Sequence, residues 1–217
     1  MVNPSPSLQT IPTDTWVKAT WDEFLTFADD PTLISGRFYY DQGEMRIEMA
    51  ALGSAHSRDN SIVSTVIVLF AAINNIRIIE FTNCSFKQTG VRECQPDIAF
   101  YIGSSFQFPP RSNSPVELNQ IAPPTLVIEI GASSLSDDLG RKQLLYRRLG
   151  VQEYWVIDVN TGNITAFSLT KAQSLQIQAS QVLPGLAISL VETALVRSQT
   201  EDDGAITRWL LTFLNQP

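Results

Sequence analysis

The sequence predicts an α/β fold in which helices flank a central mixed β-sheet. Three runs rich in β-branched and aromatic residues, at 96–102, 126–131 and 153–159, have the length and composition of strands. They alternate with segments whose apolar residues repeat at helical spacing. The 217 residues, 44% of them hydrophobic, show no internal repeat and no linker that would divide them. One domain with a central sheet is therefore expected.

The N-terminal segment is expected to differ from the rest of the chain. Residues 1–19 begin with a stretch rich in Pro, Ser and Thr that lacks apolar periodicity, so they are predicted to form a loose arm. The domain is expected to span 20–217. It opens with a Thr-x-x-Glu capping box at Thr20 and Glu23, and the helical pattern that follows ends before Pro31. These signals predict a short helix.

A hairpin and a long helix are expected next. Two β-prone runs within 36–49 surround the sequence Asp41-Gln42-Gly43, which suits a tight turn. From Ser54 to Asn75 the apolar residues recur at helical spacing, which predicts a long amphipathic helix. His56 would lie in the first turn of this helix.

The second half of the chain is expected to alternate strands and helices. A loop rich in Pro, Ser and Asn is predicted over 106–124. A helix is predicted over 136–149, because Ser and Asp residues precede it and Gly150 follows it. A final apolar helix is expected over 205–214. The strands expected from composition in this part are 76–82, 84–89, 96–102, 126–131, 153–159 and 163–169.

Composition and charge restrict the class of protein. The formal net charge of -7 argues against broad electrostatic attraction to nucleic acid, although the basic residues within 140–150 run against this trend. Cys84 and Cys94 lack CxxC spacing and His56 is the only histidine, so neither a zinc site nor a multi-histidine cage is expected. The sequence shows neither a membrane span nor a signal peptide, so a cytoplasmic protein is expected.

Glu129 is the first candidate functional residue, because it interrupts a strand that otherwise reads as buried. Side chains alternate along a strand, so Val127, Glu129 and Gly131 share one face. A carboxylate moved out of water costs several kcal/mol unless it is protonated, paired or bound to a cation. The sequence therefore predicts a partner for Glu129.

Asp97 is the second candidate, since it could meet Glu129 on one face of the sheet. In the strand at 96–102, Asp97, Ala99 and Tyr101 align, and they would face Glu129 if the two strands are neighbours. Two carboxylates brought close raise each other's pKa unless a cation lies between them. Mg²⁺ takes hard oxygen ligands and would meet this need. The alternative is that Asp97 is an ordinary strand-start residue after a proline.

Lys142 is the third candidate, because it occupies a leucine-like position on the apolar stripe of the predicted helix 136–149. The apolar members of the stripe are Leu135, Leu139, Leu145 or Tyr146, and Leu149. Lys142 would therefore face the sheet. Its ammonium could point toward Glu129 and stabilise developing charge, or it could form a plain salt bridge or extend its stem across the core edge.

Several linked motifs resemble a known family. The segments "QPDIAFYIG", "PPTLVIEI", "SLSDDLGRKQLLY" and "LGVQEYWVIDV" are similar, in order and spacing, to the Uma-two family of restriction endonucleases within the PD-(D/E)xK nuclease superfamily. The upstream segments "GEMRIEM" and "HSRDN" also look like that family. The resemblance runs from about Trp21 to the C-terminus.

The resemblance implies a restriction-endonuclease-like fold and metal-dependent hydrolysis of phosphodiester bonds in DNA. Asp97 and Glu129 match the acidic positions and, with the Ile130 carbonyl, would hold Mg²⁺ or Mn²⁺. Gly131 stands where the superfamily places its lysine. In this family a lysine from the following helix takes that role, and Lys142 matches it, so it would stabilise the transition state.

Some assignments remain open in the sequence. His56 could join the site or could simply cap or decorate its helix. Glu48 and Glu80 are possible extra metal ligands. The chain could be an active nuclease, a nucleic-acid-binding relative without catalysis, or a structural or protein-interaction domain with a buried Glu129–Lys142 ion pair.

DNA is the partner that the resemblance implies, and a homodimer is the expected assembly. The residues of the final helix that could cover the sheet or pair with a second copy are Trp209, Leu210, Phe213 and Leu214. No helix-turn-helix, zinc finger or strongly basic arm that would read a base sequence is recognisable.

Overall fold

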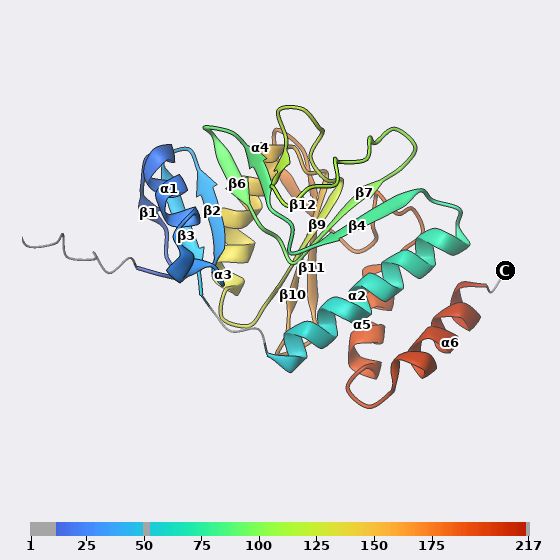
Figure 1. The fold of residues 1–217 in the computed structure, drawn as a ribbon. Coiled ribbons are helices and arrows are strands. Elements are labelled where there is room, and N and C mark those ends of the chain that lie inside the picture. Colours follow the sequence, from blue (N-terminus) through green and yellow to red (C-terminus); the bar gives the residue numbers. More distant parts are fainter. Residues whose placement is uncertain (1–11, 50–52, 216–217) are drawn as a thin grey trace, which may run out of the picture.

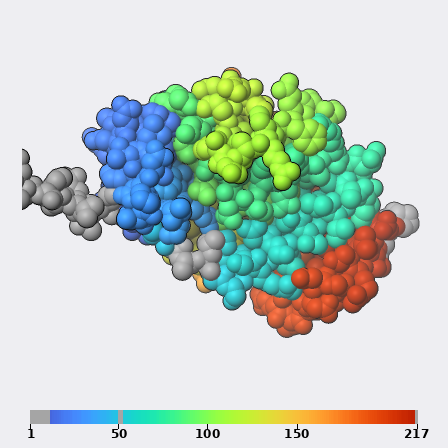
Figure 2. All heavy atoms as spheres, viewed as in Figure 1, coloured from blue at the N-terminus to red at the C-terminus, as the bar shows by residue number. Residues whose placement is uncertain are grey.

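The computed structural model describes residues 12–49 and 53–215, and these form two six-stranded sheets with helices around them (Figure 1). The predicted α/β class, with helices flanking a central mixed sheet, is confirmed. The second sheet was not expected. In Figure 2, α1 (Trp21–Ala28) lies at one end of the visible face and α6 (Asp203–Leu214) at the other.

The central sheet carries the strands that were predicted from composition. β9 (Leu126–Gly131) lies in its middle, parallel to β10 and antiparallel to β7. Its β-branched residues suit a strand that is buried on both faces. The strand order is β12 (Ser174–Ile177), β11 (Ile164–Leu169), β10 (Glu153–Asp158), β9, β7 (Ile98–Ile102) and β4 (Ile78–Thr82).

The second sheet is built largely from short strands. The predicted hairpin is present, with Gln42 at φ 49° and Gly43 at φ 98°, as a type I′ turn requires. Several of the other strands have two or three residues, too few to reveal an alternating pattern. The order is β1 (Val17–Lys18), β3 (Glu44–Glu48), β2 (Arg37–Asp41), β6 (Arg92–Cys94), β5 (Phe86–Gln88) and β8 (Val116–Glu117).

Two predicted boundaries change because of these short strands. Val17 and Lys18 pair with β3, so the last part of the predicted arm 1–19 belongs to a sheet. Residues 1–11 of that arm lie outside the described residues. The predicted loop 106–124 contains β8, which pairs with β5.

Helices cover one face of the central sheet, and the second sheet with α4 (Gln143–Leu149) covers the other (Figure 1). The predicted capping box at Thr20 and Glu23 is present. α5 was not predicted. Among the described residues, no helix meets the length and apolarity that a membrane crossing needs. The helices on the first face are α2 (Ser54–Ile73), α5 (Ile188–Arg197) and α6 (Asp203–Leu214), whereas α1 (Trp21–Ala28) packs on the second sheet and the short η1 (Pro31–Leu33) follows it.

The predicted helix 136–149 is divided by a π-helical turn. α3 (Leu135–Asp137) leads into the π segment η2 (Asp138–Lys142), followed by α4 (Gln143–Leu149). A π turn adds a residue to one turn of the helix and so shifts which side chains face inward. Leu139, placed on the apolar stripe by the sequence, is 41% exposed, whereas Asp138 and Lys142 are each 1% exposed. The stripe was therefore wrong at Leu139 and right at Lys142.

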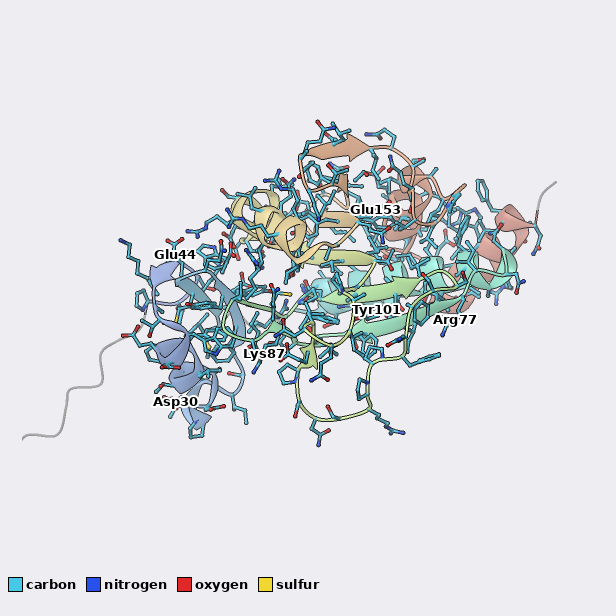
Figure 3. All side chains as sticks on the ribbon, turned by 90° about the horizontal axis from the view of Figure 1, so that it is seen from above. Asp30, Glu44, Arg77, Lys87, Tyr101 and Glu153 are labelled. Carbon is cyan, nitrogen blue, oxygen red and sulfur yellow. The ribbon has the colours of Figure 1, made fainter. Side chains whose placement is uncertain are left out.

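Figure 3, which views the molecule from above, shows the second sheet toward one end and the start of β4 toward the other. Glu44 and Lys87 lie toward the end that carries the second sheet, and Arg77 lies toward the opposite end. The candidate residues occupy the region between the two sheets, because Asp97 and Glu129 face the cluster that contains Tyr39 of β2. The second sheet thus covers the face of β7 and β9 toward which Asp97 and Glu129 point.

Candidate active site

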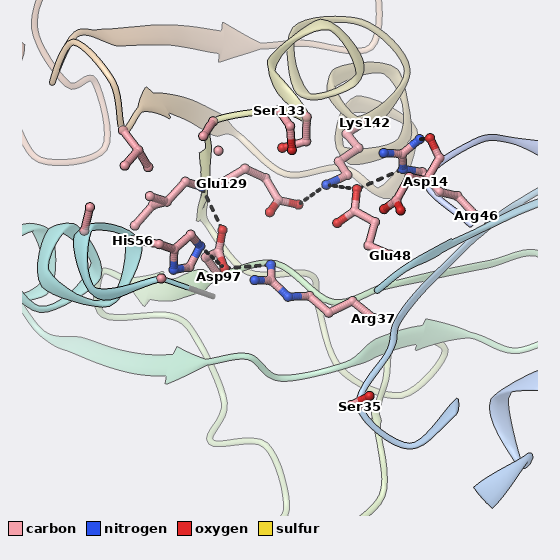
Figure 4. A pocket seen from close by; sticks show the side chains of 17 residues that line it. Asp14, Ser35, Arg37, Arg46, Glu48, His56, Asp97, Glu129, Ser133 and Lys142 are labelled. Atoms are coloured by element: carbon pink, nitrogen blue, oxygen red, sulfur yellow. Dashed lines mark hydrogen bonds and ion pairs between the residues drawn. The ribbon is translucent and has the colours of Figure 1, made fainter. Parts of the chain in front are cut away.

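A cavity of about 540 Å³ collects most of the residues that the sequence singled out (Figure 4). It is lined from β2, β3, the start of α2, the end of β9 and η2. The predicted residues that line it are Asp97, Glu129, Ile130, Lys142, His56 and Glu48. The lining residues Arg37 and Arg46 were not predicted.

Asp97 lies immediately before β7, and the strand register explains why it meets Glu129. Ile98 pairs with Ile128 in the antiparallel β7–β9 ladder, so one further step sets Asp97 opposite Glu129. Asp97 is 1% exposed, and its Oδ2 accepts a hydrogen bond of 2.7 Å from the Ile130 N–H. The predicted meeting of the two carboxylate positions on one face of the sheet agrees with this register.

Asp97 is held in its charged form by its neighbours. Its Oδ1 lies 2.6 Å from Arg37 Nη1 and 3.1 Å from His56 Nε2. Burial alone would raise the pKa of Asp97, but His56, Arg37 and the Ile130 N–H together keep it below its usual value. The site therefore presents a buried carboxylate anion.

Glu129 is fully enclosed and carries its charge less readily. Its Oε1 accepts hydrogen bonds from the hydroxyls of Tyr146 and Tyr39, and lies 3.7 Å from Lys142 Nζ. Burial raises the pKa of Glu129 to about 8, against the opposing effect of Lys142, and the nearby acidic groups add to the rise. The chain's own cations thus leave the charge of Glu129 incompletely balanced.

Lys142 reaches the carboxylates from the helix side. Its Nζ lies 2.9 Å from Glu48 Oε1 and 2.9 Å from Asp138 Oδ1, and 4.4 Å from the centre of the Tyr39 ring. Burial would lower its pKa, but Glu129 and the other acidic groups hold the pKa well above the usual value. Lys142 is thus a charged, enclosed ammonium. Its closest partners are Glu48 and Asp138, not Glu129.

Asp138 and Gly131 explain why the lysine comes from the helix. A Cβ at Gly131 would lie 2.5 Å from Ser134 Oγ and 2.7 Å from Asp138 Oδ2, so position 131 has no room for a side chain. Asp138 fills the space beside β9 and accepts a 2.6 Å hydrogen bond from Ser134 Oγ. From the sequence, Asp138 was predicted only as a helix-capping candidate. Its position four residues before Lys142 could have indicated that the two side chains lie close together.

The Gly131→Ala substitution is expected to destabilise the protein by about 1–3 kcal/mol, because the added methyl group overpacks against Ser134 and Asp138. Urea unfolding measures the change. Gly140→Ala is the matched control, since a Cβ there meets nothing within 4 Å. That control should be neutral or stabilising, because alanine is favoured over glycine in helices. Equal stabilities for the two variants would contradict the close approach at β9.

The remaining predicted residues divide between the site and the periphery. His56 lies in the first turn of α2 and contacts Asp97, so it joins the site. Glu48 also joins it, with Oε1 accepting a 2.8 Å hydrogen bond from Arg46 Nε. Glu80 does not: it lies on β4, accepts a 2.7 Å hydrogen bond from Ser64 Oγ, and is not among the residues that line the cavity.

Asp97, Glu129 and the Ile130 carbonyl offer oxygen ligands of the kind that a hard divalent cation takes. Only two of these ligands are side chains. Among residues 12–49 and 53–215, no three His, Cys, Asp or Glu side chains are arranged as a metal cage. Asp97 Oδ1 is buried and lacks a well-oriented hydrogen bond. The Gly131 carbonyl accepts a hydrogen bond from the Val159 N–H on the β10 side, whereas the Ile130 N–H donates to Asp97 on the opposite side. Because successive backbone groups of a strand point to alternate sides, the Ile130 carbonyl also lies on the Asp97 side. Mg²⁺ commonly takes one or two carboxylates and completes its shell with water and phosphate.

The fold is restriction-endonuclease-like. A family model described as "Uma2: Putative restriction endonuclease" matches residues 21–200, and the chain belongs to this family. The fold is also that of a crystal structure from Anabaena variabilis described as "a putative nuclease belonging to DUF820", with a TM-score of 0.56 and 19% identity over 82% of this chain and 99% of that one. No curated protein matches the chain.

Proposed function

We propose that this protein is a Mg²⁺-dependent endonuclease that hydrolyses phosphodiester bonds of DNA. The observation that carries the proposal is the pairing of Asp97 and Glu129 from neighbouring strands in one cavity, with Lys142 Nζ 3.7 Å from Glu129. Membership of a family described as restriction endonucleases supports the choice of substrate. Mn²⁺ is proposed as an alternative ion, since it accepts the same oxygen ligands.

In this proposal Asp97, Glu129 and the Ile130 carbonyl hold the metal. When bound, the metal would activate a water molecule and neutralise charge on the phosphate. Asp97 is suited to this role because its neighbours keep it ionised. Glu129 is suited because the chain's own cations do not keep this buried carboxyl ionised, whereas a bound divalent cation would favour its charged form.

Lys142 is proposed to stabilise the negative charge that develops on the phosphate. A buried ammonium fixed by neighbouring groups needs no rearrangement during the reaction, and such fixed charges are effective in catalysis. Glu48 and Asp138, each 2.9 Å from Nζ, supply that fixation. His56, 3.1 Å from Asp97, is proposed as an auxiliary group that helps to orient this carboxylate.

Location and assembly are also proposals. We propose a cytoplasmic enzyme that acts as a homodimer. On α6, Leu210 is buried in the core of the chain, whereas Phe213 is 49% exposed and Leu211 is 39% exposed. These two exposed side chains are the part of the predicted pairing helix that remains accessible for a second copy.

Supercoiled plasmid and single-stranded DNA, incubated with Mg²⁺, Mn²⁺ or EDTA, provide the test. The wild type is expected to cut with either metal and to be inactive in EDTA. Asp97→Asn should reduce the rate by about 10²–10³, as expected when a group that acts in the transition state is lost. Asp22→Asn, on the exposed first turn of α1, removes a carboxylate far from the cavity and should leave the rate unchanged.

The same experiment separates the alternative functions. DNA binding without cleavage under any metal condition would identify a nucleic-acid-binding relative. Absence of both binding and cleavage would indicate a structural or protein-interaction domain. Full cleavage by Asp97→Asn would leave the chain a nuclease but exclude the proposed metal site.

A further inference from the structure

Two of the cations that line the cavity are already committed to partners. Lys142 lies among Glu48, Asp138 and Glu129. Arg46 donates from Nε to Glu48 at 2.8 Å, with an Asp137 oxygen 3.3 Å from the same atom.

A further donor of Arg46 is also used. Its Nη1 donates to the Asp14 carbonyl, which ties the segment before β1 to β3. The guanidinium of Arg46 therefore acts within the wall of the cavity. Neither Arg46 nor Lys142 can turn toward a ligand without breaking several contacts.

Arg37 differs from both of these residues. Within the described chain, the only close ionic partner of its side chain is Asp97 Oδ1, 2.6 Å from Nη1, and the guanidinium forms no hydrogen bond to the side chain or backbone of another residue. A guanidinium has five N–H donors, so most of those on Arg37 remain available. Its side chain is 14% exposed, and it lines the cavity.

The position of Arg37 suits contact with a ligand. Arg37 begins β2, and it approaches Asp97 from the second sheet, while Lys142 approaches the carboxylates from the helix side (Figure 4). Burial would lower the pKa of Arg37, but Asp97 and the other nearby acids raise it, so the charge is permanent. A ligand beside Asp97 and Glu129 would thus meet a cation on each side.

We propose that Arg37 binds a non-bridging oxygen of the substrate phosphate within this cavity. The proposal rests on the proposed function, because it assumes that a nucleic-acid strand enters the site. The planar guanidinium matches two phosphate oxygens, which a lysine cannot do. Arg37 is then a substrate-binding residue in addition to its contact with Asp97.

The competing explanation is that Arg37 only neutralises Asp97, and a double-mutant comparison separates the two. Binding of a fluorescein-labelled single-stranded oligonucleotide is measured in EDTA over a range of salt concentrations. Arg37→Gln should weaken binding about tenfold and reduce the log–log salt slope by about 0.7, the value for one phosphate contact to a single strand. Both effects should persist in the Asp97→Asn background.

Arg111→Gln, on the exposed loop before β8, removes one positive charge outside the cavity and should change binding little. An effect of Arg37→Gln that disappears in the Asp97→Asn background would overturn the proposal, as would unchanged affinity. If Arg37→Gln does not fold, Arg37→Lys decides: weaker binding with an unchanged salt slope is expected, and wild-type affinity overturns the proposal.

Cleavage assays keep this inference apart from the proposed function. A wild type that binds the oligonucleotide but never cuts it would contradict the proposed endonuclease activity. The comparison of Arg37→Gln with the wild type would still test whether Arg37 binds phosphate. If the wild type cuts DNA normally and Arg37→Gln binds the oligonucleotide as tightly as the wild type, only the proposed role of Arg37 is contradicted. A wild type that neither binds nor cuts DNA contradicts both the endonuclease activity and phosphate binding by Arg37.

Discussion

Glu129→Gln is expected to abolish metal-dependent DNA cleavage, with a loss of about 10²–10³ in rate, while the protein stays folded. Glutamine keeps an oxygen that can accept the hydrogen bonds from Tyr146 and Tyr39, so the packing around the side chain is preserved. It loses the negative charge that a divalent cation requires. Calorimetric titration of Mg²⁺ and Mn²⁺, with plasmid cleavage in parallel, measures both effects.

The same variant has an expected stability profile against pH. Burial raises the pKa of Glu129 in the folded state to about 8, above its ordinary value of 4.5. The folded wild type therefore binds more protons than the unfolded chain between these values, and its stability falls as pH rises through the window. Glu129→Gln has no such group, so in EDTA it should match the wild type near pH 5.

Above pH 8 the variant should be the more stable protein, by about 3–5 kcal/mol, because each unit of pKa shift corresponds to about 1.4 kcal/mol. Urea unfolding in EDTA at several pH values measures this difference. Glu192→Gln is a control, since Glu192 binds the Ile164 N–H outside the cavity. A Glu129→Gln variant that binds Mg²⁺ and cuts like the wild type would exclude Glu129 from the metal site, whatever its stability.

The central sheet and its two opposed carboxylates were accessible from the sequence. β9 and β7 are long enough for alternation to assign faces, and Val127 and Ala99 do share a face in the structure. Asp97 and Glu129 follow from the same alternation. Gly150 ends the helix at φ 92°, as its type and position predicted.

The rest of the site depends on contacts that local patterns do not encode. Arg37 enters from β2, and only the packing of the second sheet over β7 and β9 brings it to Asp97. Asp138 lies one helical turn before Lys142, but in the sequence it reads as a helix-capping residue, and only the packing against Gly131 and Ser134 shows that it is buried. Lys142 was predicted because it occupies an inward-facing position of the apolar stripe where a leucine would be expected. The same stripe was wrong at Leu139, which is exposed.

Lys142→Met is expected to destabilise the protein by about 3–5 kcal/mol and to abolish cleavage. Methionine fills the volume of the stem, but it leaves Glu48, Glu129 and Asp138 buried without the cation that lies among them. Removing one partner of a buried ionic group costs more than the group contributes, because the remaining charges lose both water and counter-charge. Urea unfolding at pH 8 gives the size of the loss.

The loss should depend on pH in a direction that identifies its cause. Lys142 lowers the pKa of Glu48, Glu129 and Asp138, so all three folded-state pKa values rise without it. Those of Glu129 and Asp138 then lie further above the values of the unfolded chain, and that of Glu48 rises from below its ordinary value. The folded variant then takes up protons as pH falls, and its deficit should shrink from pH 8 to pH 5. Lys171→Met, on an exposed turn, should change stability by less than about 0.5 kcal/mol at either pH.

Two companion variants distinguish charge from packing. Lys142→Arg keeps the cation and should retain most of the stability, and Asp138→Asn added to Lys142→Met should recover part of the loss by removing one unpaired charge. A deficit that is the same at pH 5 and pH 8, with no recovery from Asp138→Asn, would mean that Lys142 contributes only volume. In that event the three carboxylates would have to be protonated already, and an ammonium placed to stabilise a phosphate would no longer describe this site.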